Sequence, residues 1–431
     1  MIQPKRVVIV GGGFAGMYAA LEMKRLASAG HRVTLVSAEN FMQYQPFLPE
    51  VASGTIDPRA VVVPLRPLLR HATVEVGEVT AIDHANRRID VRIPDGAAVG
   101  LDYDVLALTA GSWSRVLPIP GLAEHGVGFK TIQEAIYLRN HVLSRLDVAS
   151  ETEDAGRRRA ALTFVFVGAG YAGVEALGEL EDLARDATRN YPALPANEMR
   201  WILVEASGRI LPELPADLAS YAAAQLRGRG IEILLDTRLE SAEAGTIALS
   251  DGQMFPADTL VWTAGVKPSP LAGLGGFPVD GSGRVRVDDR LRVLGIPDVW
   301  AAGDIAAVPD VSTGGFAPPT AQHAMREGRT LGRNLTAAIL GGDINPFVWR
   351  NVGGVCSLGR YKGVANVFGI KVRGFPGWFL HRSYHLWAMP TIGRRVRIAL
   401  DWMIALLFPR DITQFGSFED PRGPFRRAAG G

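Results

Sequence analysis

The chain has 431 residues, of which 47% are hydrophobic and 21% are charged, as expected for a folded protein of two or three domains. The 46 Lys and Arg nearly balance the 44 Asp and Glu, so overall charge gives no argument for a nucleic-acid partner. Cys356 is the only cysteine, which excludes a disulfide framework, a Cys-rich metal site and any reaction that needs two thiols. We therefore expect no nucleic acid and no metal.

The apolar run after the N-terminus, Val7–Val10, is too short for the core of a signal peptide. No other stretch reaches the roughly 18 uncharged apolar residues of a membrane-spanning helix. The expected topology is therefore cytoplasmic.

A strand, a glycine loop, a helix and a second strand occur twice along the chain, which predicts an α/β fold with two Rossmann-like domains. A charged stretch before the second copy, Glu151–Arg159, is expected to be a solvated linker. The first copy is predicted at Arg6–Val10, Gly11–Gly16, Met17–Ser28 and Arg32–Ser37, and the second at Leu162–Val167, Gly168–Gly173, Val174–Asp186 and Arg200–Glu205.

The first loop has the dinucleotide-binding pattern Gly11-x-Gly13-x-x-Gly16. The first glycine allows the tight turn, the second lets the backbone approach a pyrophosphate, and the third lets helix and strand pack closely. The helix N-terminus supplies partial positive charge for the anion. The pattern alone could be a simple turn, but its place between a buried strand and a helix favours a dinucleotide site.

The acid that usually binds the ribose at the end of the second strand is missing. Ser37 stands there, followed by Ala38 and Glu39. Ser37 can hydrogen-bond the ribose hydroxyls, with Glu39 or a backbone group helping. Glu39 could equally be a solvated loop residue, so the sequence leaves the ribose partner open.

Two later apolar strands complete a flavin site. Leu106–Gly111 ends in a small-residue turn that includes Ala110, and Val299–Asp304 ends in Gly303-Asp304. An acid at such a strand end can accept hydrogen bonds from the ribityl hydroxyls of a flavin. In this order along the chain, the N-terminal glycine loop and the Gly-Asp turn resemble the flavoprotein superfamily that binds two dinucleotides, which implies FAD at the first loop.

The second loop, Gly168-x-Gly170-x-x-Gly173, precedes a strand that ends in Glu205. A carboxylate there chelates the adenosine 2′- and 3′-hydroxyls and repels a 2′-phosphate, so NADH is favoured over NADPH. Arg209 weakens this preference, because an arginine can accommodate the phosphate. The segment Val261–Val266 resembles the closing strand of the nicotinamide domain in the same superfamily.

The number of cysteines limits which electron acceptors the protein can use. Disulfide reductases and sulfide–quinone reductases of this layout use paired cysteines, and Cys356 is alone. The remaining motifs resemble type II NADH dehydrogenases, the single-subunit NADH:quinone oxidoreductases that pump no protons. Gly168–Glu175 matches their second loop, and Ala321–Ala324 matches their AQxA quinone motif. That motif usually has Gln where this chain has Arg326.

The resemblance covers essentially the whole chain and implies roles for individual residues. Asn40-Phe41 and Pro46–Gly54 resemble the loop that covers the flavin. The implied FAD site comprises Gly11, Gly12, Gly13, Phe14, Ala15, Gly16, Ser37, Ala38, Glu39, Val79, Ala110, Gly111, Asp304 and Ala321. The implied NADH site comprises Gly168, Gly170, Tyr171, Ala172, Gly173, Glu205 and Gly265.

Two residues are predicted to serve catalysis. Pro318-Pro319-Thr320 is a helix-start signal, so a helix N-terminus can face the flavin and stabilise its anionic reduced form, while Gln322 donates to a quinone carbonyl. Glu175, expected in the first turn of its helix, can relay protons to the reduced quinone. The alternatives are an acid favoured by the helix dipole for Glu175 and a helix-surface amide for Gln322.

The C-terminal part, Lys371–Asp411, is rich in arginine and aromatic residues. Within it, Ile398–Phe408 is apolar except for Asp401 and too short to cross a bilayer. Arginines flank it on both sides, which is typical of a helix lying on an anionic membrane surface. A buried core helix, or a dimer helix with a basic solvated face, is the alternative.

The sequence therefore predicts a FAD-binding domain at 1–115 and 290–345, an NAD(H)-binding domain at 116–289 and an amphipathic membrane-associating region at 346–431. The resemblance implies a peripheral NADH:quinone oxidoreductase on the cytoplasmic face of the cell membrane, in a family that often dimerises. The alternatives are a soluble NADH-dependent ferredoxin or rubredoxin reductase and a non-enzymatic redox-sensing or scaffold flavoprotein, as in apoptosis-inducing-factor-like chains.

Overall fold

The structure is a computed structural model that describes residues 3–311, 313–349 and 353–414. Contacts between Cα atoms divide the chain into two compact units. Unit 1 comprises Met1–Pro46, Val61–Arg115 and Gly265–Val352, and unit 2 comprises Phe47–Ala60, Val116–Ala264 and Gly353–Gly431.

Unit 1 contains a five-stranded parallel sheet in which the N-terminal strand is central, because its residues are apolar and β-branched on both faces. The strand order is β21 (Val299–Ala301), β9 (Val105–Leu108), β1 (Arg6–Val10), β2 (Arg32–Ser37) and β5 (Thr73–Val76).

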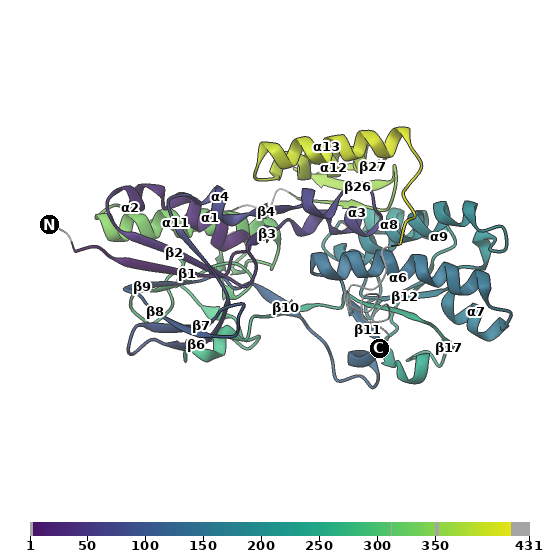
Figure 1. Ribbon diagram of the computed structural model, residues 1–431, viewed down its shortest axis with the longest axis horizontal. Coiled ribbons are helices and arrows are strands. Elements are labelled where there is room, and N and C mark those ends of the chain that lie inside the picture. The colour runs from purple at the N-terminus through teal and green to yellow at the C-terminus, as the bar shows by residue number, and fades with distance from the viewer. Residues whose placement is uncertain (1–2, 312, 350–352, 415–431) are drawn as a thin grey trace, which may run out of the picture. The chain divides into compact units, whose positions relative to one another are not determined.

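Helices α1 (Phe14–Glu22) and α11 (Ala321–Leu340) lie side by side in unit 1 (Figure 1). Glycines of α11 make this close approach feasible. A Cβ on Gly328 would lie 2.3 Å from the carbonyl oxygen of Ala15, and a Cβ on Gly332 would lie 2.3 Å from that of Ala19. The packing therefore depends on the absence of a side chain at both positions.

The rest of unit 1 consists of short elements. Its small sheets pair β3 (Phe41–Gln43) with β4 (Val62–Pro64), β10 (Ser112–Ser114) with β19 (Val266–Pro268), β20 (Val285–Arg286) with β22 (Ala306–Ala307), β23 (Pro309–Asp310) with β24 (Gly315–Phe316), and β6 (Glu78–Asp83) with β7 (Arg88–Arg92) and β8 (Ala98–Asp102). Its short helices are α2 (Lys24–Ser28), α4 (Leu65–Leu68) and α10 (Leu271–Leu274).

Unit 2 contains a second five-stranded parallel sheet, in the order β11 (Gly126–Gly128), β18 (Thr259–Trp262), β12 (Thr163–Val167), β13 (Arg200–Val204) and β14 (Glu232–Leu234). Its helices are α3 (Leu48–Ala52), α5 (Leu122–His125), α6 (Ile132–Glu151), α7 (Ala155–Ala161), α8 (Tyr171–Ala187) and α9 (Ala216–Arg227). An antiparallel sheet joins β15 (Leu239–Ser241), β16 (Thr246–Leu249) and β17 (Met254–Pro256). Short 3₁₀ helices occur at Gln45–Phe47, Pro58–Ala60, Thr188–Asn190, Ala196–Glu198 and Glu243–Gly245.

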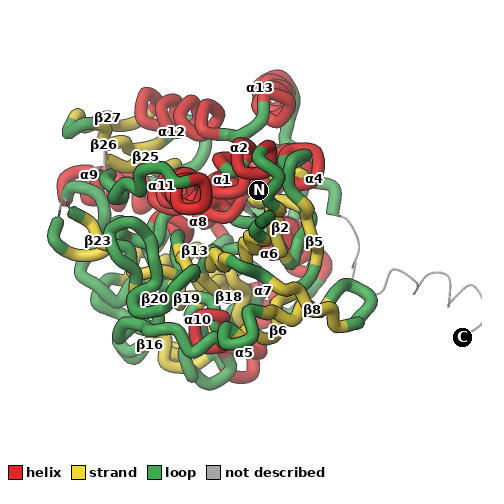
Figure 2. Tube along the Cα trace, turned by 90° about the vertical axis from the view of Figure 1, so that its left-hand side faces the viewer, coloured by secondary structure: helices red, strands yellow, loops and turns green. Residues whose placement is uncertain are grey.

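The C-terminal part of unit 2 is a three-stranded antiparallel sheet followed by two helices (Figures 1 and 2). The strands are β25 (Gly353–Ser357), β26 (Gly363–Val367) and β27 (Ile370–Gly374), and the helices are α12 (Phe375–Ala388) and α13 (Ile392–Leu407). Among the described residues, no helix is long and apolar enough to cross a bilayer. Residues 350–352 and 415–431 of the predicted C-terminal region lie outside the described residues.

Two sequence-based expectations about elements were wrong. The stretch Glu151–Arg159 is exposed, but it is not an open linker, because α7 begins at Ala155 and the side chain of Asp154 accepts a hydrogen bond from the Arg157 N–H as its N-cap. The helix expected at Met17–Ser28 is two helices separated at Met23.

The two units divide the chain differently from the predicted domains in four places. Residues 47–60, predicted in the FAD-binding domain, group with unit 2, and residues 346–352, predicted in the C-terminal region, group with unit 1. Residues 265–289 group with unit 1, whereas the sequence assigned them to the NAD(H) domain. Residues 353–431 group with unit 2 instead of standing apart. The predicted domains were assigned by the ligand they are expected to bind, so they stay predictions.

Candidate functional site

The first glycine loop is shaped to approach a ligand. Gly11 has φ +112°, and a Cβ on it would lie 2.4 Å from the carbonyl oxygen of Thr109. A Cβ on Gly16 would lie 1.8 Å from the carbonyl oxygen of Gly11, so the loop and α1 touch backbone to backbone. Gly13 has nothing within 4 Å of such a Cβ and precedes the first residue of α1. This open side at a helix N-terminus fits a pyrophosphate.

Ser37 lies at the edge of the same loop. It ends β2, is 6% exposed, and has its Oγ 2.4 Å from where a Cβ on Gly12 would be. Glu39, two residues later, is exposed. Ser37 and Glu39 both remain predictions as partners of the ribose. Val79 is buried on β6, and its place in the FAD site remains a prediction.

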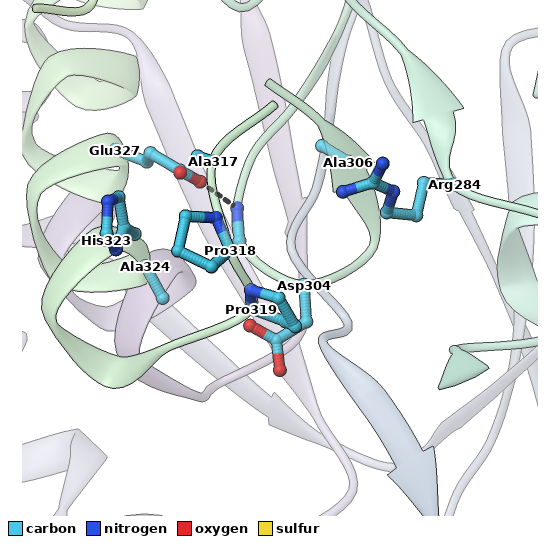
Figure 3. A pocket seen from close by; sticks show the side chains of 10 residues that line it. Arg284, Asp304, Ala306, Ala317, Pro318, Pro319, His323, Ala324 and Glu327 are labelled. Carbon is cyan, nitrogen blue, oxygen red and sulfur yellow. Dashed lines mark hydrogen bonds between the residues drawn. The ribbon is translucent and has the colours of Figure 1, made fainter. Parts of the chain in front are cut away.

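Asp304 lies in a hollow of unit 1 that also holds residues from the start of α11 (Figure 3). Its Oδ2 accepts a hydrogen bond from the Ser112 hydroxyl at 2.6 Å. The hollow is lined by Arg284, Gly303, Asp304, Ala306, Ala317, Pro318, Pro319, His323, Ala324 and Glu327. The Ser112 hydroxyl therefore orients this carboxylate beside the hollow, which suits a partner for ribityl hydroxyls.

Glu327 forms one wall of this hollow and was missed by the sequence reasoning. It is 2% exposed, and its Oε2 accepts a hydrogen bond from the Gly303 N–H at 2.7 Å, the contact drawn in Figure 3. Burial raises the pKa of this carboxyl to about 7. The sequence signal that could have identified Glu327 is its position in the helix of the AQxA motif, two residues after Met325 and next to Gly328.

Helix α11 begins at Ala321, as predicted from the Pro-Pro-Thr start signal. The side chain of Thr320 caps it and accepts a hydrogen bond from the His323 N–H. The Oγ of Thr320 also lies 2.8 Å from Nδ1 of His323, whose pKa is lowered, chiefly by burial. The N-terminus of the helix is therefore held in one conformation.

Gln322 is not a simple surface amide, because its Oε1 is buried and has no hydrogen-bond partner among the described residues. Arg326 stands one turn later, and its Nη1 donates to the Gln322 carbonyl oxygen at 2.8 Å. The guanidinium of Arg326 lies over the Trp349 ring at 3.5 Å from its centroid. The departure from the usual Gln therefore places a stacked cation beside Gln322.

The second glycine loop repeats the construction in unit 2. A Cβ on Gly168 would lie 2.8 Å from the Ala264 nitrogen, and a Cβ on Gly173 would lie 1.9 Å from the Gly168 carbonyl oxygen. A Cβ on Gly170 would have its nearest neighbour, Oε1 of Glu213, at 3.9 Å. Gly170 immediately precedes α8. Tyr171 and Ala172 are the first two residues of α8 and follow Gly170 directly. This is a second cradle that fits a pyrophosphate.

Glu205 follows β13 and lies against this loop. Its Oε2 accepts a hydrogen bond from the Ala169 N–H at 2.7 Å, and its Oε1 accepts from the N–H and Oγ of Ser207 at 2.9 and 2.8 Å. Arg209 donates to the Pro212 carbonyl. Glu205 is therefore fixed at the loop. Gly265, the last residue predicted for the NADH site, groups with unit 1 and has φ +93°.

Glu175 is buried and does not lie in the first turn of α8, because the helix already begins at Tyr171. Its Oε1 accepts a hydrogen bond from the Ser357 N–H at 2.9 Å. The Nε2 of His381 lies 3.0 Å from the same oxygen. An acid favoured by the helix dipole would lie in the first turn, so the position of Glu175 does not fit that alternative.

The sequence reasoning missed Ser357 and His381, which come from β25 and α12. It also missed Glu50 on α3, whose Oε2 accepts from Nε1 of Trp402 at 2.6 Å and pairs with Arg382 at 2.9 Å. Burial raises the pKa of Glu50, and Arg382 opposes the shift. No local sequence pattern predicts these contacts, because the partners in each contact are far apart in the sequence.

No group of three or more His, Cys, Asp or Glu in the described part of the chain could hold a metal ion.

The comparisons with known proteins agree with the two cradles. The Pyridine nucleotide-disulphide oxidoreductase family matches residues 5–328, which is most of the chain, and the protein belongs to it. Its fold class is therefore the predicted one.

Relatives define the branch of this family. The chain is 31% identical over 94% of its length to the type II NADH:quinone oxidoreductase Ndh of Mycobacterium tuberculosis, covering 89% of that protein. It is 29% identical over 96% of its length to a probable NADH dehydrogenase of Dictyostelium discoideum, covering 92% of it. NDH2 from Plasmodium falciparum, solved with NADH, has a TM-score of 0.88 at 18% identity over 95% of this chain and 100% of that one.

The chain therefore belongs to the type II NADH:quinone oxidoreductases, which are FAD-dependent oxidoreductases. The resemblance inferred from the glycine loops and the AQxA motif is confirmed. The roles of the individual residues remain predictions.

The contact between α8 and its loop generates a first prediction. Gly173→Ala places a methyl group 1.9 Å from the Gly168 carbonyl oxygen, so the cradle must open. We expect the Kd for NADH to rise at least about tenfold, equivalent to about 1.4 kcal/mol, with the FAD content unchanged. Equilibrium NADH titration and flavin absorbance of the purified protein measure the two quantities.

Gly16→Ala is the reciprocal control, because it disturbs the first cradle in the same way. It should lower the FAD content. Loss of FAD in the Gly173 variant, or unchanged NADH binding in it, would contradict the assignment of the two cradles.

Proposed function

We propose that this protein oxidises NADH through bound FAD and passes the two electrons to a membrane quinone, without pumping protons. The observation that carries the proposal is the pair of glycine cradles, each open at a helix N-terminus, in a chain whose only cysteine is buried. Two dinucleotides can bind, but a dithiol cannot take the electrons. The relatives' quinone-reductase names support the same acceptor.

FAD supplies a centre that accepts a hydride and later gives up two electrons. The residues of this chain bind and orient the reactants. Gly11–Gly16 and Asp304 would hold the flavin nucleotide, and Gly168–Gly173 with Glu205 would hold NADH. The N-terminus of α11 would supply partial positive charge beside the bound flavin.

The overall reaction determines how many protons the side chains at the quinone must supply. NADH, one proton and the quinone give NAD⁺ and the quinol, so each turnover takes one proton from water. Gln322 donates a hydrogen bond to a quinone carbonyl, and Glu175 delivers the proton to the reduced quinone. The burial of Glu175 beside His381 and Ser357 suits a group that exchanges a proton out of contact with bulk water.

We also propose that the protein is peripheral to the cytoplasmic face of the membrane and that α13 lies on the lipid surface. The apolar side chains on one side of α13 are exposed, including Val396, Met403 and Leu407 at 53%, 56% and 76%. Their spacing places them on one helical face. Arginines 394, 395 and 397 lie at the start of the helix, where anionic headgroups would meet them.

The proposed activity is tested by steady-state NADH oxidation with several electron acceptors. Water-soluble ubiquinone and menaquinone analogues should support turnover, because the chain provides a route for two electrons and a proton. A ferredoxin or rubredoxin should support little or none. The reverse order of acceptors would contradict the proposal and favour the soluble reductase.

The preference for NADH is tested at Glu205. Glu205→Gln keeps an acceptor for the Ala169 N–H but removes the charge that repels a 2′-phosphate. The ratio of kcat/KM for NADPH to that for NADH should rise roughly tenfold, since a hydrogen bond to a charged group contributes about 1.5–3 kcal/mol. Glu205→Ala should in addition raise KM for NADH.

The exposed acid Glu243 offers a matched control in the same unit. Glu243→Gln should leave unchanged both the ratio of kcat/KM for NADPH to that for NADH and the KM for NADH. An unaltered preference for NADH in the Glu205 variants would refute the role proposed for this carboxylate.

The membrane proposal is tested by charge on the exposed face of α13. Val396→Glu, Met403→Glu and Leu407→Glu together should abolish sedimentation with vesicles of anionic phospholipid, because each carboxylate opposes burial in the interface. Turnover of a water-soluble quinone should persist. Met254→Glu changes an equally exposed residue, at 71%, on β17 and should sediment like the wild type. Continued binding of the triple variant would count against α13 as the anchor.

A further inference from the structure

Helix α8 carries a row of acids that begins at Glu175. Glu179, Asp182 and Asp186 follow it at spacings of four, three and four residues, which places them on one side of the helix. Glu175 and Glu179 are 7% and 1% exposed, whereas the side chains of Asp182 and Asp186 are 19% and 25% exposed. The row leads over about 16 Å from the buried end to the surface.

Ser357 joins the two buried members of this row. Its N–H donates to Oε1 of Glu175 at 2.9 Å, and its hydroxyl donates to Oε1 of Glu179 at 3.3 Å. The hydroxyl oxygen also accepts from the Gly359 N–H at 3.3 Å, and the residue is 3% exposed. One buried serine therefore contacts both carboxyl groups, Glu175 through its N–H and Glu179 through its hydroxyl, which also lies 3.4 Å from the Gly359 carbonyl oxygen.

Glu179 has an unused oxygen. Its Oε2 is buried and has no hydrogen-bond partner among the described residues. Nη2 of Arg410 is the nearby cation, but at 3.8 Å it is too far to donate. A buried oxygen without a donor is unfavourable when the carboxylate is charged, so this atom is a place for a proton or an internal water.

The outer members of the row, Asp182 and Asp186, are the ones that solvent reaches. Burial raises the pKa of Asp182 to about 6, opposed by Arg229 and increased by Glu179. Asp186, the most exposed of the four, lies 3.3 Å from Nε of Arg410.

Other charged groups face the row from neighbouring elements. His381 on α12 faces Glu175, and Glu50 on α3 and Arg410 after α13 interact with Glu179. Ser357 differs from these groups because it contacts Glu175 and Glu179 at the same time.

We propose that Glu179 and Ser357 carry protons from the Asp182–Asp186 edge of unit 2 to Glu175. The proposal rests on the proposed function, in which each quinone reduced takes one proton from water. The proton enters at the surface acids, passes to Glu179, crosses the Ser357 hydroxyl and reaches Glu175, which gives it to the reduced quinone. The electrons come from NADH by way of FAD, so the row carries protons alone and no further oxidant or reductant is needed.

The test separates the two half-reactions by anaerobic rapid mixing. In Glu179→Gln, reduction of the flavin by NADH should keep its wild-type rate, because hydride transfer does not use the row. Reoxidation by a water-soluble quinone should slow about tenfold or more, in line with the usual contribution of a positioned proton donor. The solvent deuterium isotope effect on reoxidation should increase, which a merely structural role would not produce.

Glu181→Gln is the matched control. Glu181 is also 1% exposed on α8, and its carboxylate pairs with Arg185 and with Arg229, which also pairs with Asp182 at 2.9 Å. It should leave the reoxidation rate and its isotope effect unchanged. Ser357→Ala retains the N–H to Glu175 and removes the hydroxyl, so it should reproduce the effect of Glu179→Gln, and Glu179→Asp should restore part of the rate.

Wild-type reoxidation in Glu179→Gln, with an unaltered isotope effect, would overturn the proposal. Equal slowing in the Glu181 and Glu179 variants would also overturn it, because the effect would then be structural. Failure of quinone to reoxidise the wild-type flavin would instead contradict the proposed function.

Discussion

The close packing of helix α8 at two of its glycines is the constraint on which the account of unit 2 depends. Gly173 touches the loop that starts at Gly168, and a Cβ on Gly178 would lie 2.8 Å from the backbone carbon of Leu358. Because a helix is a stiff element, these contacts fix its rotation and its axial position. The N-terminus of α8 then faces the nucleotide cradle, and Glu175 and Glu179 lie against Ser357.

The same principle organises unit 1. Gly328 and Gly332 of α11 lie directly on the backbone of α1, which itself begins at the first glycine loop. The loop proposed to bind a pyrophosphate and the helix that carries Gln322 are therefore parts of one packed pair. Asp304 and Glu327 lie in the hollow beside that pair, with a hydrogen bond from Gly303 holding Glu327 in place.

The parts of the molecule that a short stretch of sequence determines could be predicted. Glycine spacing, apolar strands and the Thr320 cap gave both cradles and the first residue of α11. Contacts made across long separations could not, because no local pattern relates Glu175 to Ser357 or Glu50 to Trp402. The prediction of a linker at Glu151–Arg159 was wrong for a different reason. Its many charged residues favoured a solvated linker, although Asp154 caps a helix there.

The central claim is that one chain takes electrons from NADH and gives them to a quinone through its flavin. An anaerobic titration followed by the visible absorbance of the flavin tests it most directly. Stoichiometric NADH should bleach the flavin, and stoichiometric quinone should then restore the oxidised spectrum. A flavin that NADH reduces but that excess quinone leaves reduced would contradict the account.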